Sequence, residues 1–493
     1  GTNGKTSIAN FYYQILTLNN KNVATIGTLG VYSKNLNFKT NNTTIDPVNI
    51  HRILKNLYDN KVENVILEAS SHGLKQKRLD GLKFKIGIFT NLSHDHLDYH
   101  KSFKDYLDSK LYLFKKLLMK NSSIVTDLDI PEYKKIKSIA RKRKIKLNTI
   151  SNKYGDLSII SHKYFGEKQS LKIKYKKKIY TFQVSLIGKI QLKNLLMSMI
   201  AANMSNIDFK SIISVIKKIK PVSGRLEKIG FIKNNSSVIL DYAHTPDALR
   251  ICLQNIKDQF KNRKVSIVFG CGGNRDQFKR SLMGRIANDY CDKIYLTDDN
   301  PRKENPKKIR QNIKKKIDNS KLYEIPNREK AINLAIQNLL SGEILVVAGK
   351  GHEKIQDYGS YKKIFSDKDC IIKYVKKKNK LLKNDLKFNI IKEAIRNNNL
   401  SSNTKIRKAS INSKNIRKND IFFAIKGKKN DGNKFTNEAL NKGASLAIVS
   451  KIYDLKKKNK KIIVKNTLDF LTKTSEIMRT NSSSKIIAIT GSC

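Results

Sequence analysis

Three things are scarce in this sequence of 493 residues: cysteine, acidic side chains and long apolar runs. No run approaches the roughly 18 to 20 apolar residues that cross a bilayer, and the start carries no secretion signal. The cysteines show neither paired metal spacing nor a disulfide framework, and their odd number is typical of a reducing compartment. They are Cys252, Cys271, Cys291, Cys370 and Cys493. We therefore expect a cytoplasmic protein without a membrane span, with structural cysteines.

Acidic residues number 41 against 99 basic ones, which gives a formal net charge of +58. Such a balance raises the hypothesis of a basic, nucleic-acid-binding P-loop protein, because Lys and Arg neutralise phosphates. However, only 17 of the basic residues are Arg, and the Lys residues are scattered through every segment beside abundant Asn and Ile. This distribution indicates compositional drift rather than a binding surface, so we expect no nucleic-acid partner, although anionic small substrates would be attracted.

Strand and helix patterns alternate along most of the chain, which predicts parallel sheets with covered faces. Residues 5–18 read as a helix, 62–71 and 85–93 as buried strands, and 101–118 as an amphipathic helix. Residues 156–187 alternate in the manner of a hairpin insertion, and 190–218 return to helix. The fold class that we expect is α/β.

The patterns divide the chain into several units. Residues 1–222 form a P-loop parallel-sheet ATPase domain, and 223–378 form a Rossmann-like α/β domain with strands near 237–244, 264–273, 292–299 and 343–351. A run rich in Lys and Asn predicts a linker at 379–385. A third small α/β domain is expected at 386–485, and 486–493 resemble the start of a second phosphate loop.

The chain begins with Gly1-Thr2-Asn3-Gly4-Lys5-Thr6-Ser7, which has the Gly-Lys-Thr core of a phosphate loop. In such a loop the backbone N–H groups surround phosphate oxygens, the lysine reaches the terminal phosphates, and the threonine can bind Mg²⁺. A strand normally presents such a loop, and none precedes residue 1. We therefore expect the sequence to be a fragment of a longer, fused polypeptide.

Two polar stretches follow the predicted strands of the first unit. Glu68 comes at the carboxyl end of one strand, where ligands bind in open parallel sheets, and it is well placed to hold Mg²⁺. The next strand leads into Thr90–His100, which contains three His and two Asp residues within seven positions. Such a cluster could hold a metal ion or position phosphate, although a zinc site would lack Cys partners.

The chain resembles the Mur ligase family of peptidoglycan synthesis. The phosphate loop, Glu68-Ala-Ser-Ser-His-Gly-Leu-Lys-Gln-Lys-Arg78 and Asp95-His-Leu-Asp-Tyr-His100 stand in the order and spacing of that family. Within it, residues 1–375 are most similar to the ligases that add the third amino acid to UDP-N-acetylmuramoyl-L-alanyl-D-glutamate. The resemblance does not include the family's N-terminal, UDP-binding domain.

The resemblance implies roles for individual residues. Lys5, Glu68, His96 and Lys110 would be catalytic, with Thr6, Glu68, His96 and Lys110 at Mg²⁺, where Lys110 matches a carbamylated lysine. The other residues expected at ATP are Gly1, Thr2, Asn3, Gly4, Ser7, Asn91, Asn194, Arg225, Asp241 and His244. The muramoyl peptide would contact Thr43, Thr44, Ser70, Gln76 and Arg78, although Ile45 replaces the proline that usually follows the paired threonines.

The resemblance also implies the amino acid that is added. Asp299-Asn300-Pro301-Arg302 is similar to the signature of the ligases that take meso-diaminopimelate, and Arg275, Gly349 and Glu353 match further contacts. The chemistry agrees, because diaminopimelate has a second carboxylate that an arginine can bind through two hydrogen bonds, whereas lysine has none. Glu353 would face the distal ammonium of the substrate.

The implied activity is an ATP-dependent ligase that acts through an acyl phosphate on small-molecule substrates, and we expect a monomer. Residues 406–449 resemble the leading domain of the following ligase of the pathway, although Asn412-Ser413-Lys414 replaces its usual Asp-Ser-Arg. As a fragment the chain is expected to be inactive, whereas its intact parent would be active. Two further hypotheses are a folylpolyglutamate synthetase-like ligase and, for the fragment, a non-catalytic scaffold.

Overall fold

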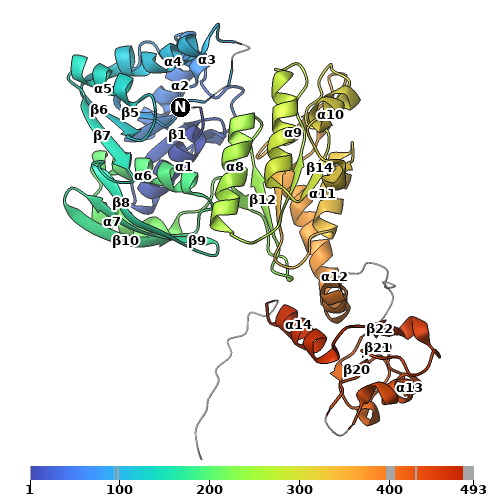
Figure 1. The fold of residues 1–493 in the computed structure, drawn as a ribbon. Coiled ribbons are helices and arrows are strands. Elements are labelled where there is room, and N and C mark those ends of the chain that lie inside the picture. Colours follow the sequence, from blue (N-terminus) through green and yellow to red (C-terminus); the bar gives the residue numbers. More distant parts are fainter. Residues whose placement is uncertain (1, 94, 97–98, 396–405, 428–429, 481–493) are drawn as a thin grey trace, which may run out of the picture. The chain divides into compact units, whose positions relative to one another are not determined.

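The structure is a computed structural model that describes residues 2–93, 95–96, 99–395, 406–427 and 430–480 (Figure 1). The chain divides into two compact units. The first comprises residues 1–229, 239–332 and 346–368, and the second comprises residues 230–238, 333–345 and 369–493. Within the described residues, no helix is long and apolar enough to cross a membrane.

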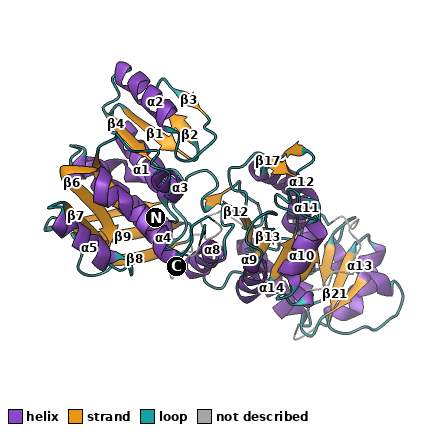
Figure 2. Ribbon diagram, turned by 90° about the horizontal axis from the view of Figure 1, so that it is seen from above, coloured by secondary structure: helices purple, strands orange, loops and turns teal. Residues whose placement is uncertain are grey.

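The first sheet of the first unit has four strands in the order β3-β2-β1-β4. Their bounds are Val23–Gly27 for β1, Gly30–Tyr32 for β2, Asn37–Phe38 for β3 and Asn64–Leu67 for β4. Helix α1, Lys5–Leu18, has the predicted bounds. Helix α2, Pro47–Asp59, packs against this sheet through Ile50 and Leu57, which share a core with Ala24 and Ile26 of β1 (Figure 2).

The second sheet has six strands in the order β10-β9-β8-β7-β6-β5. Their bounds are Phe84–Phe89 for β5, Leu118–Asp127 for β6, Lys146–Ser151 for β7, Leu157–Phe165 for β8, Lys168–Tyr175 for β9 and Lys178–Val184 for β10. Strands β5 to β8 pair in parallel, whereas β8, β9 and β10 form an antiparallel meander. The predicted hairpin segment is therefore confirmed, and it extends the parallel sheet.

Helices accompany these strands, and three of them fall in the segments 101–118 and 190–218 that were predicted to be helical. They are α3 Ser71–Lys75, α4 Phe103–Tyr112, α5 Tyr133–Lys142, α6 Lys189–Met204 and α7 Phe209–Val215. Helix α6 is apolar around most of its circumference because it is buried on several sides. Its Leu192, Leu195 and Met199 share a core with Phe11 and Ile15 of α1.

The third sheet has the order β11-β12-β16-β13-β14-β15. The strands are β11 Glu227–Lys228, β12 Ser237–Asp241, β13 Val265–Phe269, β14 Lys293–Leu296, β15 Leu322–Glu324 and β16 Ile344–Ala348. The accompanying elements are α8 Pro246–Gln259, α9 Phe278–Tyr290, α10 Pro306–Lys314, α11 Arg328–Gln337 and the hairpin of β17 Ile355–Asp357 with β18 Lys362–Ile364. The four strands predicted here, β12, β13, β14 and β16, are confirmed.

The second unit contains a four-stranded parallel sheet in the order β19-β20-β21-β22. Its strands are β19 Ala409–Ser410, β20 Ile421–Phe423, β21 Leu446–Val449 and β22 Lys461–Ile463, with helices α13 Thr436–Asn441 and α14 Thr467–Thr480. Phe423 and Ile448 form a core with Phe470 of α14. Residues 486–493, predicted to begin a second phosphate loop, lie outside the described residues.

The segment predicted as a linker, residues 379–385, is helical. These residues lie inside helix α12, which runs without interruption over Asp367–Ile395. Lys is a good helix former, and buried contacts such as that of Leu382 add to the stability of the helix despite the poorer propensity of Asn. A polar composition therefore does not distinguish a solvated helix from a loop.

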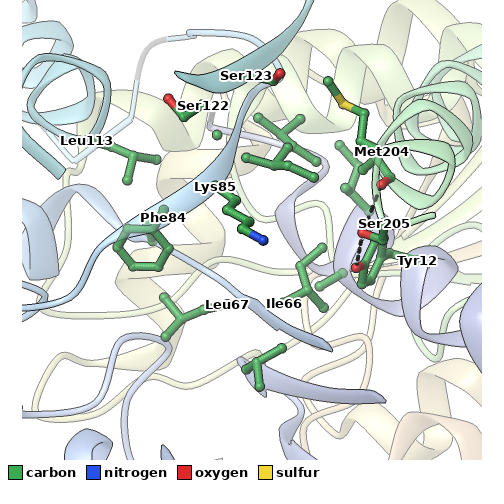
Figure 3. A pocket seen from close by; sticks show the side chains of 18 of the residues that line it. Tyr12, Ile66, Leu67, Phe84, Lys85, Leu113, Ser122, Ser123, Met204 and Ser205 are labelled. Carbon is green, nitrogen blue, oxygen red and sulfur yellow. Dashed lines mark hydrogen bonds between the residues drawn. The ribbon is translucent and has the colours of Figure 1, made fainter. Parts of the chain in front are cut away.

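The expectation that β4 and β5 are buried strands is only half met. Every described side chain of β4 is partly or fully exposed, and Val65 is 38 % exposed. Both strands stand at the edges of their sheets, and together they line a cavity of about 860 Å³. In Figure 3, Ile66 and Leu67 of β4 lie across this cavity from Phe84 and Lys85 of β5. An apolar run thus predicts a strand but not the number of its covered faces.

Candidate active site

The phosphate loop of the first unit leads directly into α1. Gly4 has φ 92°, and a Cβ atom at this position would lie 2.5 Å from Oδ1 of Asn194. Only glycine combines this backbone conformation with so close a neighbour. The predicted ATP residue Asn194 therefore lies against the loop, on helix α6.

The segment after β5 anchors the same loop. Asn91 accepts hydrogen bonds from the loop through its backbone oxygen, at 2.9 Å from the nitrogen of Thr2, and through Oδ1, at 2.9 Å from the nitrogen of Asn3. The Thr2 hydroxyl is 3.0 Å from the hydroxyl of Tyr106 on α4. The structure thus places Asn91 as a support of the loop backbone.

Glu68 is the best-defined carboxylate of the site. It follows β4, is only 4 % exposed, and accepts a hydrogen bond from the Thr6 hydroxyl at 2.9 Å. The backbone nitrogen and the hydroxyl of Thr28 donate to the same carboxylate at 2.9 and 3.2 Å. A hydroxyl and a carboxylate side by side at a phosphate loop are the oxygen ligands that Mg²⁺ prefers, so these two predicted ligands fit the ion.

The other predicted metal residues are His96 and Lys110, and the charge of Lys110 acts on His96. Burial lowers the pKa of His96 to about 4, because the effect of Asp95, which raises it, is smaller. The positive charges of Lys5 and Lys110 also lower this pKa. Among the described residues, no group of three or more His, Cys, Asp or Glu side chains could hold a metal ion. His94 and Asp98 lie outside that part of the chain.

Lys110 is buried on α4, with 4 % exposure, and its ammonium lies 4.4 Å from the centre of the Tyr106 ring. Burial, followed by the charge of Lys5, moves the pKa of Lys110 well below its usual value. Burial also lowers the pKa of Lys5, although Glu68 and Asp95 oppose it. Two lysines thus converge on one enclosed region, which favours the neutral form of Lys110.

The residues predicted at the muramoyl peptide form a connected group near α3. Arg78 donates to Oε1 of Gln76 at 2.8 Å and to the backbone oxygen of Thr44 at 2.7 Å. Thr44 is 1 % exposed and hydrogen-bonds to Ser70, whereas the Thr43 hydroxyl lies 3.1 Å from that of Thr28. The structure brings all five residues together and gives Thr44 a supporting position.

The residues of segment 223–247 that were predicted to contact the nucleotide also lie close together. Both carboxylate oxygens of Asp241 accept backbone hydrogen bonds, from Leu226 at 2.7 Å and Ala243 at 2.8 Å. Burial raises the pKa of Asp241 despite these bonds and the nearby Arg225. The Arg225 guanidinium stacks 4.5 Å from the centre of the Tyr242 ring, and His244 contacts the Tyr242 backbone oxygen.

The predicted amino-acid pocket lies at the carboxyl ends of β14 and β16. Asn300 donates to Oε2 of Glu353 at 3.1 Å, and the Arg302 guanidinium donates to the Gly273 oxygen at 2.8 Å. Gly349 has φ 108°, and a Cβ atom there would lie 2.7 Å from Oδ2 of Asp299. Of the predicted contacts, Arg275 is exposed. A basic and an acidic side chain therefore stand beyond the carboxyl ends of strands of one sheet.

Comparison with known proteins decides the family. Descriptions of the Mur ligase middle domain, the Mur ligase glutamate ligase domain and the Mur ligase catalytic domain match residues 1–202, 224–351 and 405–479. A UDP-N-acetylmuramoyl-L-alanyl-D-glutamate–2,6-diaminopimelate ligase from Rickettsia conorii is 41 % identical over 381 residues, which cover 76 % of this chain and 78 % of the relative. The chain belongs to the Mur ligase family. A ligase of the same name from Rhizobium meliloti is 39 % identical over 367 residues, covering 74 % and 75 %.

Solved structures agree with this Mur ligase assignment. A ligase titled with the same activity has a TM-score of 0.57 and 31 % identity, covering 76 % of this chain and 77 % of that one. A MurF ligase from Thermotoga maritima in complex with ADP has a TM-score of 0.55 and 17 % identity, covering 77 % and 79 %. A folylpolyglutamate synthase from Mycobacterium tuberculosis has a TM-score of 0.56 and 15 % identity, covering 71 % and 87 %. The last two show the fold alone. Mur ligases in general depend on ATP and require Mg²⁺.

Sequence reasoning missed several residues of this Mur ligase site. Thr28 holds Glu68, Tyr106 joins the phosphate loop to Lys110, and Lys350 reaches into the amino-acid pocket. A lone Thr, Tyr or Lys carries no pattern that separates it from a surface residue in a lysine-rich chain. Their positions depend on contacts between segments distant in sequence.

Proposed function

We propose that this Mur ligase chain belongs to an enzyme that joins meso-diaminopimelate to UDP-N-acetylmuramoyl-L-alanyl-D-glutamate with ATP. Two relatives of that name are 41 and 39 % identical to this chain over 381 and 367 residues. The arrangement of Asn300, Arg302 and Glu353 is the observation that carries the proposal. It offers a guanidinium and a carboxylate to a substrate whose distal end has both charges.

The phosphate loop and Glu68 would bind the nucleotide end of the reaction. Loop N–H groups at the start of α1 and the Lys5 ammonium are suited to the phosphates of ATP. Thr6 and Glu68 would hold Mg²⁺, which supplies neutralisation of the phosphate charge when bound. Gln76 and Arg78 would place the muramoyl dipeptide, with the D-Glu carboxylate toward the terminal phosphate.

Lys110 would act as a carbamate. Burial lowers the pKa of Lys110 and so favours its neutral amine, which can add CO₂ and lose a proton to form a carbamate anion. The anion would remove the repulsion between Lys110 and Lys5 and would add oxygen atoms that can bind a cation. A signal from the carbamate carbon in the NMR spectrum of protein kept under ¹³CO₂, lost in Lys110→Met, tests this assignment.

The chemistry would proceed in two balanced steps. The γ-carboxylate oxygen of D-Glu attacks the terminal phosphorus of ATP, and the bond to ADP breaks. The diaminopimelate amine then attacks the acyl carbon, phosphate leaves, and the nitrogen loses a proton. The protein contributes position and charge neutralisation rather than a covalent step.

The experiment is ADP release by the native polypeptide that carries this chain, with UDP-muramoyl dipeptide and each candidate amino acid in turn. Diaminopimelate is expected to support turnover, and lysine is expected to support at most about one hundredth of it. Turnover with a folate and glutamate instead would favour the synthetase-like hypothesis. Tight, salt-sensitive binding of nucleic acid without ADP release would favour the basic P-loop hypothesis.

We infer that residues 386–485 are the leading, UDP-sugar-binding domain of a second Mur ligase fused to the first. The match at 405–479 and an independent core around Phe423 support this inference. Asn412 accepts a hydrogen bond from the Lys414 nitrogen at 2.9 Å, and Ser413 donates to Glu438 at 3.1 Å, so the unusual Asn-Ser-Lys triplet forms an ordered turn. Chemical-shift changes in this segment on adding UDP-muramoyl tripeptide would test the assignment.

A further inference from the structure

Lys350 is the most completely enclosed cation of the amino-acid pocket. It follows β16, is 0 % exposed, and donates three hydrogen bonds. The acceptors are Oδ1 of Asn300 at 3.0 Å, Oε2 of Glu353 at 3.1 Å and the backbone oxygen of Ile355 at 2.7 Å. An ammonium has three donors, so each has an acceptor here. A buried charge is costly unless it is paired in this way, which indicates that the surroundings are organised around it.

Lys350 sets the direction of the Asn300 amide. Oδ1 of Asn300 accepts from Lys350 and also from the Asp357 nitrogen at 2.9 Å. Two donors on one side require the oxygen there, so the NH₂ group must face Oε2 of Glu353 at 3.1 Å. Without the ammonium, the amide would lose one of the two donors that fix its orientation.

Lys350 also holds Glu353. Oε2 accepts from both Lys350 and Asn300, while Oε1 accepts from the Tyr242 hydroxyl at 3.2 Å. Burial raises the pKa of Glu353, but the Lys350 charge and these hydrogen bonds outweigh burial, so the pKa is lowered overall. The carboxylate is therefore ionised and fixed before any ligand arrives.

The same network reaches the basic side of the pocket. The nitrogen of Arg302 donates to the Asp357 oxygen at 3.0 Å, and the Asp357 nitrogen donates to Asn300. Arg302 has φ 52°, a conformation that most side chains avoid, so it depends on such local bonds. Lys350 thus connects Glu353 and Arg302 through Asn300 and the backbone of Asp357.

We propose that Lys350 is a positioning residue that sets the spacing of the anionic and cationic contacts for the second charged end of the amino-acid substrate. The proposal rests on the function proposed above, because it assumes a substrate with a distal ammonium and a distal carboxylate. Lys350 itself is enclosed by protein atoms and acts through Glu353 and Asn300. Preorganised contacts of this kind discriminate because the wrong substrate leaves one of them unpaired.

The test is Lys350→Met in the native polypeptide, with KM and kcat measured separately for diaminopimelate, lysine and ATP. Methionine keeps the length and apolar stem but removes all three donors. The KM for diaminopimelate is expected to rise about 10- to 100-fold, the loss typical for hydrogen bonds to charged groups, and the KM for ATP to stay within about twofold. The preference for diaminopimelate over lysine is expected to fall by a similar factor.

Lys378→Met is the matched control. Lys378 is also buried, at 5 % exposure, and its ammonium donates to the backbone oxygens of Ile336, Gln337 and Leu339. Its loss is expected to lower the melting temperature while leaving the preference for diaminopimelate unchanged. A change of preference in Lys350→Met alone therefore separates positioning from general destabilisation.

A double-mutant cycle with Glu353→Gln measures the coupling between Lys350 and Glu353, which a purely structural role of Lys350 would not produce. If Lys350 acts through Glu353, Lys350→Met added to Glu353→Gln raises the KM for diaminopimelate by no more than about threefold. The double variant contains no unpaired buried charge, so it keeps the test open even if Lys350→Met alone does not fold.

The outcomes separate the two proposals. The role of Lys350 is overturned, and the proposed function stands, if the wild-type enzyme prefers diaminopimelate and Lys350→Met keeps that preference. The same holds if the two substitutions of the cycle multiply each other's effect on KM. A wild-type enzyme that releases no ADP with diaminopimelate overturns the proposed function, and with it the role of Lys350.

Discussion

Glu68 is the residue on which most contacts of the phosphate site converge. Its carboxylate accepts from Thr6 and twice from Thr28, and Gly27 of β1 leaves room for it. A Cβ atom on Gly27 would lie 2.2 Å from Oε1 of Glu68. The position of this carboxylate is therefore determined by a neighbouring strand as well as by its own.

Gly27→Ala is expected to displace the Glu68 carboxylate from Thr6 and to lower kcat about 100-fold, the usual effect of misplacing a catalytic group by about 1 Å. The measurement is ADP release by the native polypeptide at saturating ATP. Thr28→Ser, which keeps the hydroxyl bonded to Glu68, serves as the control and should retain near wild-type kcat. Unchanged turnover in Gly27→Ala would contradict the assigned position of Glu68.

His352 provides a pH dependence at the residue scale. Burial, followed by the charge of Arg225, lowers the pKa of His352 from its ordinary value of 6.5 to about 4. The unfolded state therefore takes up a proton below about pH 6.5, whereas the folded state does so only near pH 4. Stability is lost as the pH falls through this window, and His352→Gln should remove that part of the loss.

The expected difference is at most about 3 kcal/mol between the two ends of the window, by the linkage of pKa to free energy. Urea unfolding of wild type and His352→Gln at about pH 7 and about pH 4.5 measures it. Equal losses of unfolding free energy in both proteins would show that His352 does not contribute.

At the scale of elements, helix α12 includes the segment that we expected to be a linker. Lys378 on α12 ties the helix to the end of α11 through three carbonyl oxygens. Asn379 adds hydrogen bonds with the backbone of Phe231 and Lys233. These contacts come from residues that the composition of the segment marked only as polar.

Lys380→Pro is expected to interrupt α12, because proline removes an N–H group and clashes with the preceding turn, at a cost of about 3 kcal/mol. Lys380 is exposed, so Lys380→Ala provides a control for loss of the side chain. Limited proteolysis with mass spectrometry should find new cleavage near this position only in the proline variant. Identical digestion of both variants would argue against a continuous helix.

Several elements were predictable because local patterns determine them. The glycine loop and apolar spacing gave the bounds of α1, and apolar runs located β12, β13, β14 and β16. The exposure of β4 was not predictable, because it depends on which strand lies beside it. The side chains at strand ends could be named as site candidates, whereas Thr28 and Lys350 become visible only through contacts across the fold.

At the scale of the whole molecule, several candidate residues share one kind of location. Glu68, Asn91, Asp241 and Gly349 stand at or just beyond the carboxyl ends of strands β4, β5, β12 and β16. In α/β folds this is the edge where ligands bind, because helix N-termini and loops gather there. Family membership and this placement agree. The monomeric state, the cytoplasmic location and the absence of a nucleic-acid partner stay predictions.

We propose that Arg302 selects an amino acid with a second carboxylate. The direct measurement is the ratio of kcat/KM for diaminopimelate to that for lysine, in the native polypeptide and in Arg302→Met. Loss of a bidentate guanidinium contact predicts a fall in this ratio of about 100-fold or more. A ratio that stays the same in Arg302→Met would contradict the account.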